Sequence, residues 1–291
     1  MKKTAILYII IAGVLWGTSG IFVHYLAPLG FTSFQMTATR ATVSFVCIFG
    51  YALIFKRSLL RVKLKELPLL FGLGLSLFGT GGCYFLSMQM TSVSTAVVLM
   101  YMAPIYVLIF SVLFFGERLT RTKLVSIATM MIGCCLVSGI IGGLKFDAVG
   151  ILIGFVSGLS YAAYNILTKV AMRRGMAPVS VTLYAFMFMA MIASLFSEPV
   201  KMAESISREP LLSLPLLIGL GLCTFITPYF LYTLAMKELP AGTVSSLGIV
   251  EPMSATVFSV ALFGERLDGF SVAGIVLIIF AVFLLGKTEE A

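Results

Sequence analysis

The sequence predicts an all-α integral membrane protein, in which ten transmembrane helices form two inverted five-helix repeats around a central cavity. Three observations predict this fold. Hydrophobic residues make up 60% of the 291 residues and charged residues 11%, a composition typical of membrane proteins. A stretch at the end of the first half of the chain returns in the second half, and the basic residues gather between apolar runs.

The duplication is clearest in two stretches of sixteen residues, which begin at Pro104 and Pro252. Nine of the sixteen positions are identical, and the offset of 148 residues is about half of the 291-residue chain. Tyr84 and Tyr232 are equivalent at the same offset. Self-similarity at a fixed offset indicates a repeat. We therefore predict a first five-helix repeat over residues 1–143 and a second, inverted repeat over residues 144–291.

Helices that cross a membrane need about 20 apolar residues, because the hydrocarbon core is about 30 Å thick. The first apolar run follows Met1-Lys-Lys-Thr and continues well past signal-peptide length without a small-residue cleavage site, so we predict that it is a spanning helix. The longest loop, near residues 198–209, is short and mixed in charge. The predicted spans cover residues 4–24, 33–55, 67–88, 93–115, 121–141, 147–168, 178–198, 211–236, 241–263 and 270–286.

The basic residues predict the orientation of these spans, since cytoplasmic segments carry an excess of Lys and Arg. With the N-terminus in the cytoplasm, fifteen of the twenty basic residues lie in cytoplasmic segments. Four lie on the other side, and Arg40 lies within a span. Both termini are therefore predicted to be cytoplasmic, in a multi-pass protein of the cell (plasma or inner) membrane. Each repeat has five spans, which is an odd number. The second repeat must therefore have the opposite orientation in the membrane.

Pro104 and Pro252 lie inside long apolar runs, and each run ends in Gly-Glu-Arg, at residues 116–118 and 264–266. Proline removes a backbone donor and kinks a helix. Broken helices at matching places in two halves are typical of the substrate site of a secondary transporter. Pro228, in the eighth span, is a third candidate helix break along the same path.

Glu251 is the strongest candidate for a substrate-binding residue. It lies near the middle of the ninth span, where a carboxylate is costly and usually faces the interior of the bundle. It could carry a proton or bind a cationic group of a substrate, or it could be a structural residue held by Arg40. Arg40 could bind a substrate carboxylate, although a structural ion pair or a snorkelling position is the favoured interpretation.

Aromatic and amide side chains on spans expected to face the cavity complete the candidate site. Tyr and Trp rings combine an apolar body with a polar group, but they are also common at membrane interfaces and in packed cores. The chain has a single Asn, on the sixth span. These candidates are Trp16, Tyr84, Tyr101, Tyr161, Tyr164, Asn165 and Tyr232.

Several classes of chemistry are disfavoured. The single histidine, His24, cannot build a multi-histidine metal site, and the five cysteines lie inside apolar runs without metal-ligand spacing. Neither a nucleotide-binding glycine motif nor a hydrolase motif occurs. The net charge of +8 is concentrated in short loops rather than in a basic domain. We therefore expect no metal, no cofactor, no catalytic residues and no nucleic-acid partner.

Together these residues resemble the drug/metabolite transporter superfamily, in its ten-helix EamA-type branch. The resemblance covers nearly the whole chain. It implies a secondary transporter, commonly an exporter of amino acids, other metabolites or drugs, with a cavity lined by helices 1, 3, 4, 6, 8 and 9. It differs at His24, where the family more often has Lys. The residues that carry it are Gly13-Val-Leu-Trp16-Gly17, His24, Arg40, Pro104, Gly116-Glu117-Arg118-Leu119, Gly133, Tyr161, Lys169, Glu251-Pro252 and Gly264-Glu265-Arg266-Leu267.

The interpretation is therefore a secondary transporter that exports small metabolites, such as amino acids or drug-like solutes, by alternating access. Its expected partners are a small-molecule substrate and the lipid bilayer. Coupling to protons and the choice between a monomer and a homodimer stay open. Two alternatives are an intramembrane enzyme acting on lipid or peptide and a non-transporting receptor or scaffold. The first has few polar groups for a catalytic pair, and the second leaves the duplication unexplained.

Overall fold

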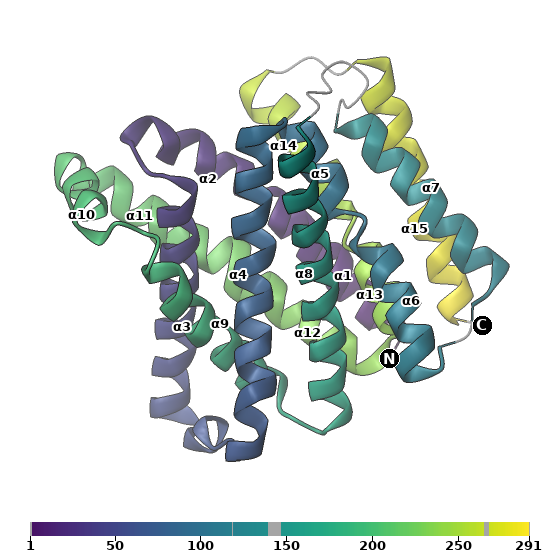
Figure 1. Ribbon diagram of the computed structural model, residues 1–291, viewed down its shortest axis with the longest axis horizontal. Coiled ribbons are helices and arrows are strands. Elements are labelled where there is room, and N and C mark those ends of the chain that lie inside the picture. Colours follow the sequence, from purple (N-terminus) through teal and green to yellow (C-terminus); the bar gives the residue numbers. More distant parts are fainter. Residues whose placement is uncertain (1, 118, 139–146, 265–267, 291) are drawn as a thin grey trace.

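The computed structural model describes residues 2–117, 119–138, 147–264 and 268–290, and this part of the chain is helical, without β-strands (Figure 1). The predicted all-α class is confirmed. The first half contains α1 (Lys2–Gly17), α2 (Ser19–Leu26), η1 (Ala27–Leu29), α3 (Ser33–Phe55), η2 (Arg57–Leu60), η3 (Leu64–Glu66), α4 (Leu67–Met90), α5 (Val93–Met100), α6 (Ala103–Phe115) and α7 (Arg121–Val137). The second half contains α8 (Ala148–Arg173), α9 (Pro178–Ser194), α10 (Pro199–Arg208), α11 (Pro210–Gly221), the π-helical turn η5 (Leu222–Ile226), α12 (Thr227–Glu238), α13 (Ala241–Leu247), α14 (Val250–Phe263) and α15 (Gly269–Glu290).

Among the described residues, eight helical segments are long and apolar enough to cross a membrane. A ninth results if α9 and α10, which are bent by 94° at their junction, count as one span. The remaining predicted span, 121–141, corresponds to α7, whose 17 residues end beside residues outside the described part. The predicted repeat boundary at residues 143 and 144 also lies outside it, as do Arg118, Glu265, Arg266 and Leu267.

Polar residues at the helix starts explain several of these boundaries. Thr32 caps α3, accepting a hydrogen bond from the Gln35 amide at 3.3 Å, while the Gln35 side chain accepts one from the Thr32 amide at 2.9 Å. Asp147 likewise accepts a bond from the Gly150 amide at the start of α8. Such caps satisfy amides that have no partner within the first turn of a helix.

The segment predicted as the longest loop is instead a helix, α10. Pro199 occupies its first turn, where a missing amide hydrogen costs nothing. Met202 and Ile206 pack against the small core cluster at the α2–α3 junction, whereas Lys201 and Glu204 are exposed. The mixed charge that suggested a loop is therefore the polar face of an amphipathic helix.

Helix breaks occur near the predicted prolines. Each proline, however, lies at the start of the helix that follows the break rather than at the break itself. A turn interrupts the α-helix at Tyr101 and Met102 before α6, and another does so at Gly248 and Ile249 before α14. Pro104, Pro228 and Pro252 then lie in the first turn of α6, α12 and α14. The expected loss of mid-helix donors is therefore largely avoided, because amides of a first turn need no partner within the helix.

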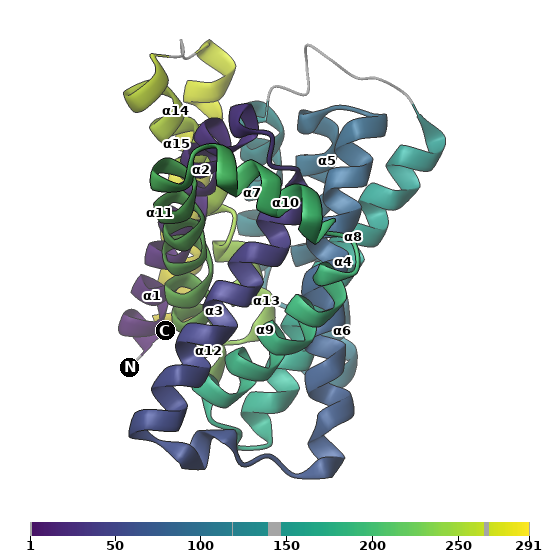
Figure 2. The same cartoon turned by 90° about the vertical axis from the view of Figure 1, so that its left-hand side faces the viewer.

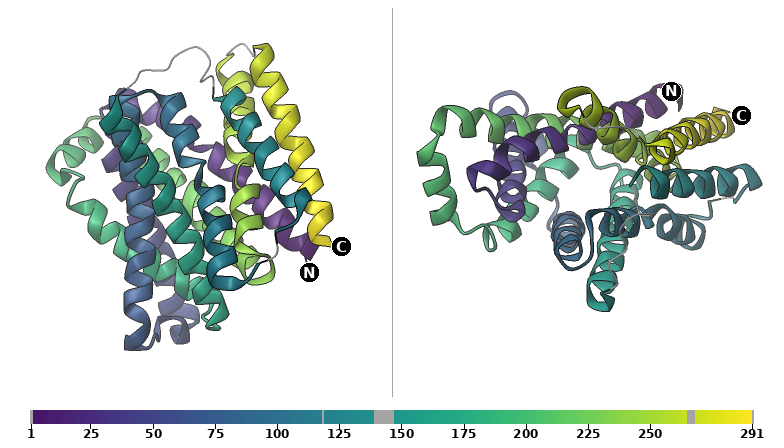
Figure 3. Two further views of the ribbon diagram at one scale, coloured as in Figure 1. Left: turned by 45° about the vertical axis from the view of Figure 1, so that its right-hand side comes forward. Right: turned by 90° about the horizontal axis from the view of Figure 1, so that it is seen from above.

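The helices pack in pairs that join the two halves of the chain. α4 packs on α8, α1 on α12 and α3 on α9, and α7 packs on α15 at one edge of the bundle, away from α10 (Figures 1 and 3). α1 and α8 run in opposite directions, as do α7 and α15 (Figures 1 and 2). Both ends of the chain lie at one end of the bundle, here called the terminal end, and the other is called the distal end (Figure 1).

Two glycines bring α7 and α15 into backbone contact. A Cβ atom on Gly274 would lie 2.6 Å from the carbonyl oxygen of Gly133 and 2.9 Å from the amide nitrogen of Val137. A Cβ on Gly133 would lie 2.9 Å from the carbonyl oxygen of Gly274. Small residues permit this close approach, which supplies the packing energy between helices in a membrane.

We expect Gly274→Ala to lower the stability of the protein by about 1–3 kcal/mol, because the added methyl group overlaps backbone atoms that cannot move independently. Gly50→Ala in α3 is the matched control, since nothing lies within 4 Å of a Cβ there. It should leave stability unchanged or raise it by up to about 1 kcal/mol. Thermal unfolding in detergent measures both variants, and equal melting temperatures would contradict the α7–α15 contact.

Candidate functional site

The break between α13 and α14 places a carboxyl group inside the bundle. Glu251 is the second residue of α14, and its side chain is half-buried. Gly13 and Gly17 bring α1 against this turn: a Cβ on Gly17 would lie 3.1 Å from the carbonyl oxygen of Glu251, and one on Gly13 would lie 3.4 Å from its amide nitrogen. The backbone of Glu251 is thus positioned by direct contact with the first helix.

Tyr101 and Arg40 are polar neighbours of the Glu251 carboxyl group. The Tyr101 hydroxyl lies beside the carboxyl group, and the Arg40 guanidinium is close enough for an electrostatic interaction. Arg40 and Glu251 do not form a direct ion pair. The two charges are therefore neighbours, but the direct structural pair, which the sequence left open as one alternative, is not formed.

Arg40 is held by contacts of a different kind. Its guanidinium lies 4.5 Å from the centroid of the Phe225 ring, a cation–π contact between α3 and the π-helical turn η5. A Cβ on Gly81 of α4 would lie 3.5 Å from Nη2 of Arg40, so the absence of a side chain there leaves space for the guanidinium. Half-buried Arg40 thus reaches from α3 toward α4 and η5 at the centre of the bundle.

An aromatic cluster adjoins these two charges. Trp16 lies 5.1 Å from the Tyr229 ring and 5.3 Å from the Tyr232 ring, measured between centroids. Tyr164 contacts Tyr229 edge-on at 5.6 Å, and Tyr229 contacts Phe225 at 4.9 Å. Helices α1, α8 and α12 and the turn η5 therefore meet through their rings.

Tyr229 stands at the centre of this cluster, and the sequence analysis missed it. The signal was its position three residues before Tyr232, which puts both rings on one face of α12. Phe225 was missed as well. Nothing in the sequence distinguished it from Phe230, the other phenylalanine of the eighth span.

Asn165 joins α8 to α12. Its side-chain oxygen accepts a hydrogen bond from the Tyr232 hydroxyl, and its side-chain nitrogen donates to the carbonyl oxygen of Tyr161 at 2.7 Å. Tyr161 lies beside Tyr232 and also approaches α13, where a Cβ on Gly248 would be 3.2 Å from its hydroxyl. The buried side chain of Asn165 therefore helps to position Tyr161 and Tyr232.

Most of the sequence-predicted residues are brought together around Glu251. Tyr84 is half-buried on α4 and interacts electrostatically with Glu251. Pro104 and Pro228 are buried and Pro252 is half-buried, each in the first turn of its helix. The prolines shape the backbone near the site. The residues gathered around it are Trp16, Arg40, Tyr84, Tyr101, Tyr161, Tyr164, Asn165, Tyr232 and Glu251.

Two of these residues carry buried donors without a protein acceptor. They are Nε1 of Trp16 and Nε of Arg40, neither of which has a hydrogen-bond partner in the described part of the chain. Leaving a buried polar group unsatisfied is costly. These donors from α1 and α3 can instead be satisfied by a polar ligand.

A second set of polar contacts lies at the terminal end, and one of them joins the two halves. The Glu117 carboxylate accepts a hydrogen bond from the Ala241 amide at 2.9 Å, capping α13, and forms an ion pair with Lys123 at 3.5 Å. Lys169 donates to the carbonyl oxygens of Met236 and Leu239 at 2.8 and 2.6 Å, where α12 ends. Glu117 therefore caps a helix of the other half of the chain.

Ring contacts lie at both ends of the bundle. At the terminal end the Arg173 guanidinium lies 4.3 Å from the Phe115 ring centroid. At the distal end the exposed His24 ring stacks on Phe263 at 4.0 Å. Phe115 and Phe263 are equivalent at the repeat offset of 148 residues. At each end of the bundle, therefore, a cationic or ionisable side chain packs against one of two phenylalanines that are equivalent in the repeat.

A family model described as the EamA-like transporter family matches residues 3–139 and again residues 148–287. The chain belongs to this family. The predicted resemblance is confirmed, and the chain is a multi-pass membrane transporter.

Relatives of this EamA-like chain are transporters. It is 30% identical over 277 residues to an uncharacterized transporter of Archaeoglobus fulgidus, covering 95% of this chain and 94% of the relative. It is 29% identical to the threonine/homoserine exporter RhtA of Salmonella typhimurium, covering 84% and 79%. It is 25% identical to the pseudopaline exporter CntI of Pseudomonas aeruginosa, covering 72% and 71%. A solved crystal structure with a TM-score of 0.80 and 18% identity covers 100% of this chain and 99% of its own, and shares its fold.

We expect Lys169→Met to lower the stability of this EamA-like protein by about 1–3 kcal/mol, because two buried carbonyl oxygens lose a charged donor. Lys237→Met is the matched control, since Lys237 is exposed on the neighbouring helix α12. Thermal unfolding in detergent should show a lower melting temperature for Lys169→Met alone. Identical melting of both variants would mean that the contact does not hold α8 and α12 together.

Proposed function

We propose that this EamA-like chain is a secondary transporter that exports small zwitterionic solutes, such as amino acids, by alternating access. The observation that carries the proposal is the placement of Arg40 and Glu251 in one site without a direct ion pair. A guanidinium suits a substrate carboxylate and a carboxylate suits a substrate ammonium group. The unsatisfied donor of Trp16 adds hydrogen-bonding capacity, and the adjoining rings suit an apolar side chain.

The relatives support this substrate class. Threonine and homoserine, the substrates in the name of RhtA, each carry an amino and a carboxyl group. Glu251 could also carry a proton during transport. Because the candidate residues come from both halves of the chain, movement of one half against the other would change access to the site.

The proposed architecture is a pair of inverted five-helix repeats, over residues 1–143 and 144–291, with ten spans when α7 and the bent α9 are included. The two family matches and the helix breaks at Tyr101–Met102 and Gly248–Ile249 support it. The packing of α4 on α8 and of α1 on α12 supports it as well, since the two pairs are equivalent under the repeat offset. We further propose that the terminal end faces the cytoplasm, because most basic residues lie in segments at that end.

Alternating access requires that contacts at one end of the bundle break while those at the other end form. The contact of Glu117 with Ala241 at the terminal end, and the stacking of His24 on Phe263 at the distal end, are the proposed sites of these changes. Each of these two contacts joins residues of different halves, as a gate between two moving halves must.

Substrates are sought first by thermal shift with a panel of zwitterionic amino acids, because a ligand of the folded state raises its melting temperature. The best ligand is then followed as a labelled solute in proteoliposomes. Glu251→Gln should lower its transport by about tenfold or more, the value of a lost charged hydrogen bond. Glu238→Gln, an exposed position on α12, is the matched control. Unchanged transport by Glu251→Gln and Glu251→Ala at acidic and neutral pH would remove this residue from the mechanism.

Arg40→Gln separates binding of the substrate carboxylate from a structural role. We expect it to weaken binding of an amino acid by about tenfold and to leave binding of the matching amine, which lacks the carboxylate, nearly unchanged. Thermal shift and competition in proteoliposomes measure both ligands. Equal losses for the amino acid and the amine would show that Arg40 acts through the fold.

A further inference from the structure

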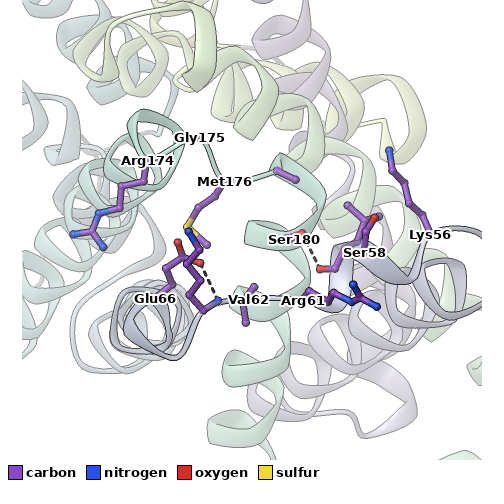
Figure 4. Close-up of a pocket in the computed structure, with 12 residues that line it drawn as sticks. Lys56, Ser58, Arg61, Val62, Glu66, Arg174, Gly175, Met176 and Ser180 are labelled. Carbon is purple, nitrogen blue, oxygen red and sulfur yellow. Dashed lines mark hydrogen bonds between the residues drawn. The ribbon is translucent and has the colours of Figure 1, made fainter.

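A pocket at the terminal end lies apart from the candidate substrate site. It has a volume of about 540 Å³ and lies between the segment that follows α3 and the turn between α8 and α9 (Figure 4). Four basic side chains and one acidic side chain line it. The basic residues are Lys56, Arg61, Lys63 and Arg174, and the acidic residue is Glu66.

Two hydrogen bonds fix the basic segment against α9. The Ser180 hydroxyl donates to the carbonyl oxygen of Leu59 at 2.8 Å, and the Tyr184 hydroxyl donates to the carbonyl oxygen of Leu60 at 2.7 Å. Glu66 accepts a hydrogen bond from the Lys63 amide at 3.2 Å, so its charge is partly engaged in this turn. The pocket is therefore built by specific contacts, beyond the general excess of basic residues that sets orientation.

The positive charge of the basic side chains that line the pocket is accessible to a ligand. Lys56, Arg61, Lys63 and Arg174 are exposed. Figure 4 shows Arg174 on one side of the pocket and Arg61 and Lys56 on the other, with Met176 and Glu66 between them. An anionic group that enters between these two sides meets Lys and Arg from two segments that are far apart in the sequence.

Exposed apolar residues beside the pocket indicate where the anion comes from. Phe55, adjacent to Lys56, is 72% exposed, and Leu64, adjacent to Lys63, is 83% exposed. Alternation of exposed apolar and basic side chains at the end of a transmembrane bundle suits the boundary between hydrocarbon and headgroups. We propose that this pocket binds the phosphate of an anionic phospholipid headgroup.

The test compares two double variants that remove two charges from the same segment. Arg61→Gln/Lys63→Gln removes charges that line the pocket, and the control Arg57→Gln/Lys65→Gln removes charges that do not. Native mass spectrometry in neutral detergent measures binding of dioctanoyl phosphatidylglycerol, with dioctanoyl phosphatidylcholine and inorganic phosphate as comparison ligands. Thermal unfolding without lipid checks that both variants fold.

We expect the unmodified protein and the control variant to bind phosphatidylglycerol in preference to phosphatidylcholine. The pocket variant should lose about tenfold or more in affinity, because basic residues near an anionic headgroup contribute most of the attraction. Equal losses in both variants would overturn the proposal in favour of diffuse charge attraction. Competition by inorganic phosphate at similar concentration would overturn the lipid assignment and identify a site for a soluble phosphate.

Discussion

The constraint on which the structure depends is that backbone polar groups within a bilayer must be satisfied by the protein itself. Continuous helices satisfy it along most of each span. Where the helices are interrupted, at Tyr101–Met102, at Gly248–Ile249 and in the π-helical turn η5, the irregular backbone lies inside the bundle. Prolines in the first turn of the following helices reduce the number of amides that need a partner. Interruptions and buried polar side chains therefore occur in the same place.

The helix interruptions explain the position of the candidate site in the bundle. A helix that restarts at Val250 presents Glu251 in its first turn, close to the break and to α1. The Asn165–Tyr232 hydrogen bond and the ring contacts of Tyr229 hold the opposite wall of the site. Arg40 is stabilised by its cation–π contact with Phe225, and the missing side chain of Gly81 leaves room for its guanidinium. Arg40 can therefore lie near Glu251 without forming an ion pair with it. The two charges therefore lie in the same part of the bundle but stay apart.

The ends of the bundle follow the same constraint. Where α12 ends, two carbonyl oxygens are satisfied by Lys169 of α8, and where α13 begins, the Ala241 amide is satisfied by Glu117, which follows α6. The Glu117 contact joins the two halves of the chain, whereas the Lys169 contacts lie within the second half. The backbone requirement at helix ends thus supplies contacts between the halves as well as within one of them.

The sequence by itself determined the helical class, most of the spans, the duplication and most of the candidate residues, because hydropathy, prolines and a 148-residue offset are local or periodic signals. It could not predict α10, since a short amphipathic helix and a charged loop have similar compositions. It also missed Tyr229 and Phe225, and it left open whether Arg40 pairs directly with Glu251. Only the tertiary structure decided these points, because they depend on which face of each helix turns inward and on how closely glycines let neighbouring helices approach.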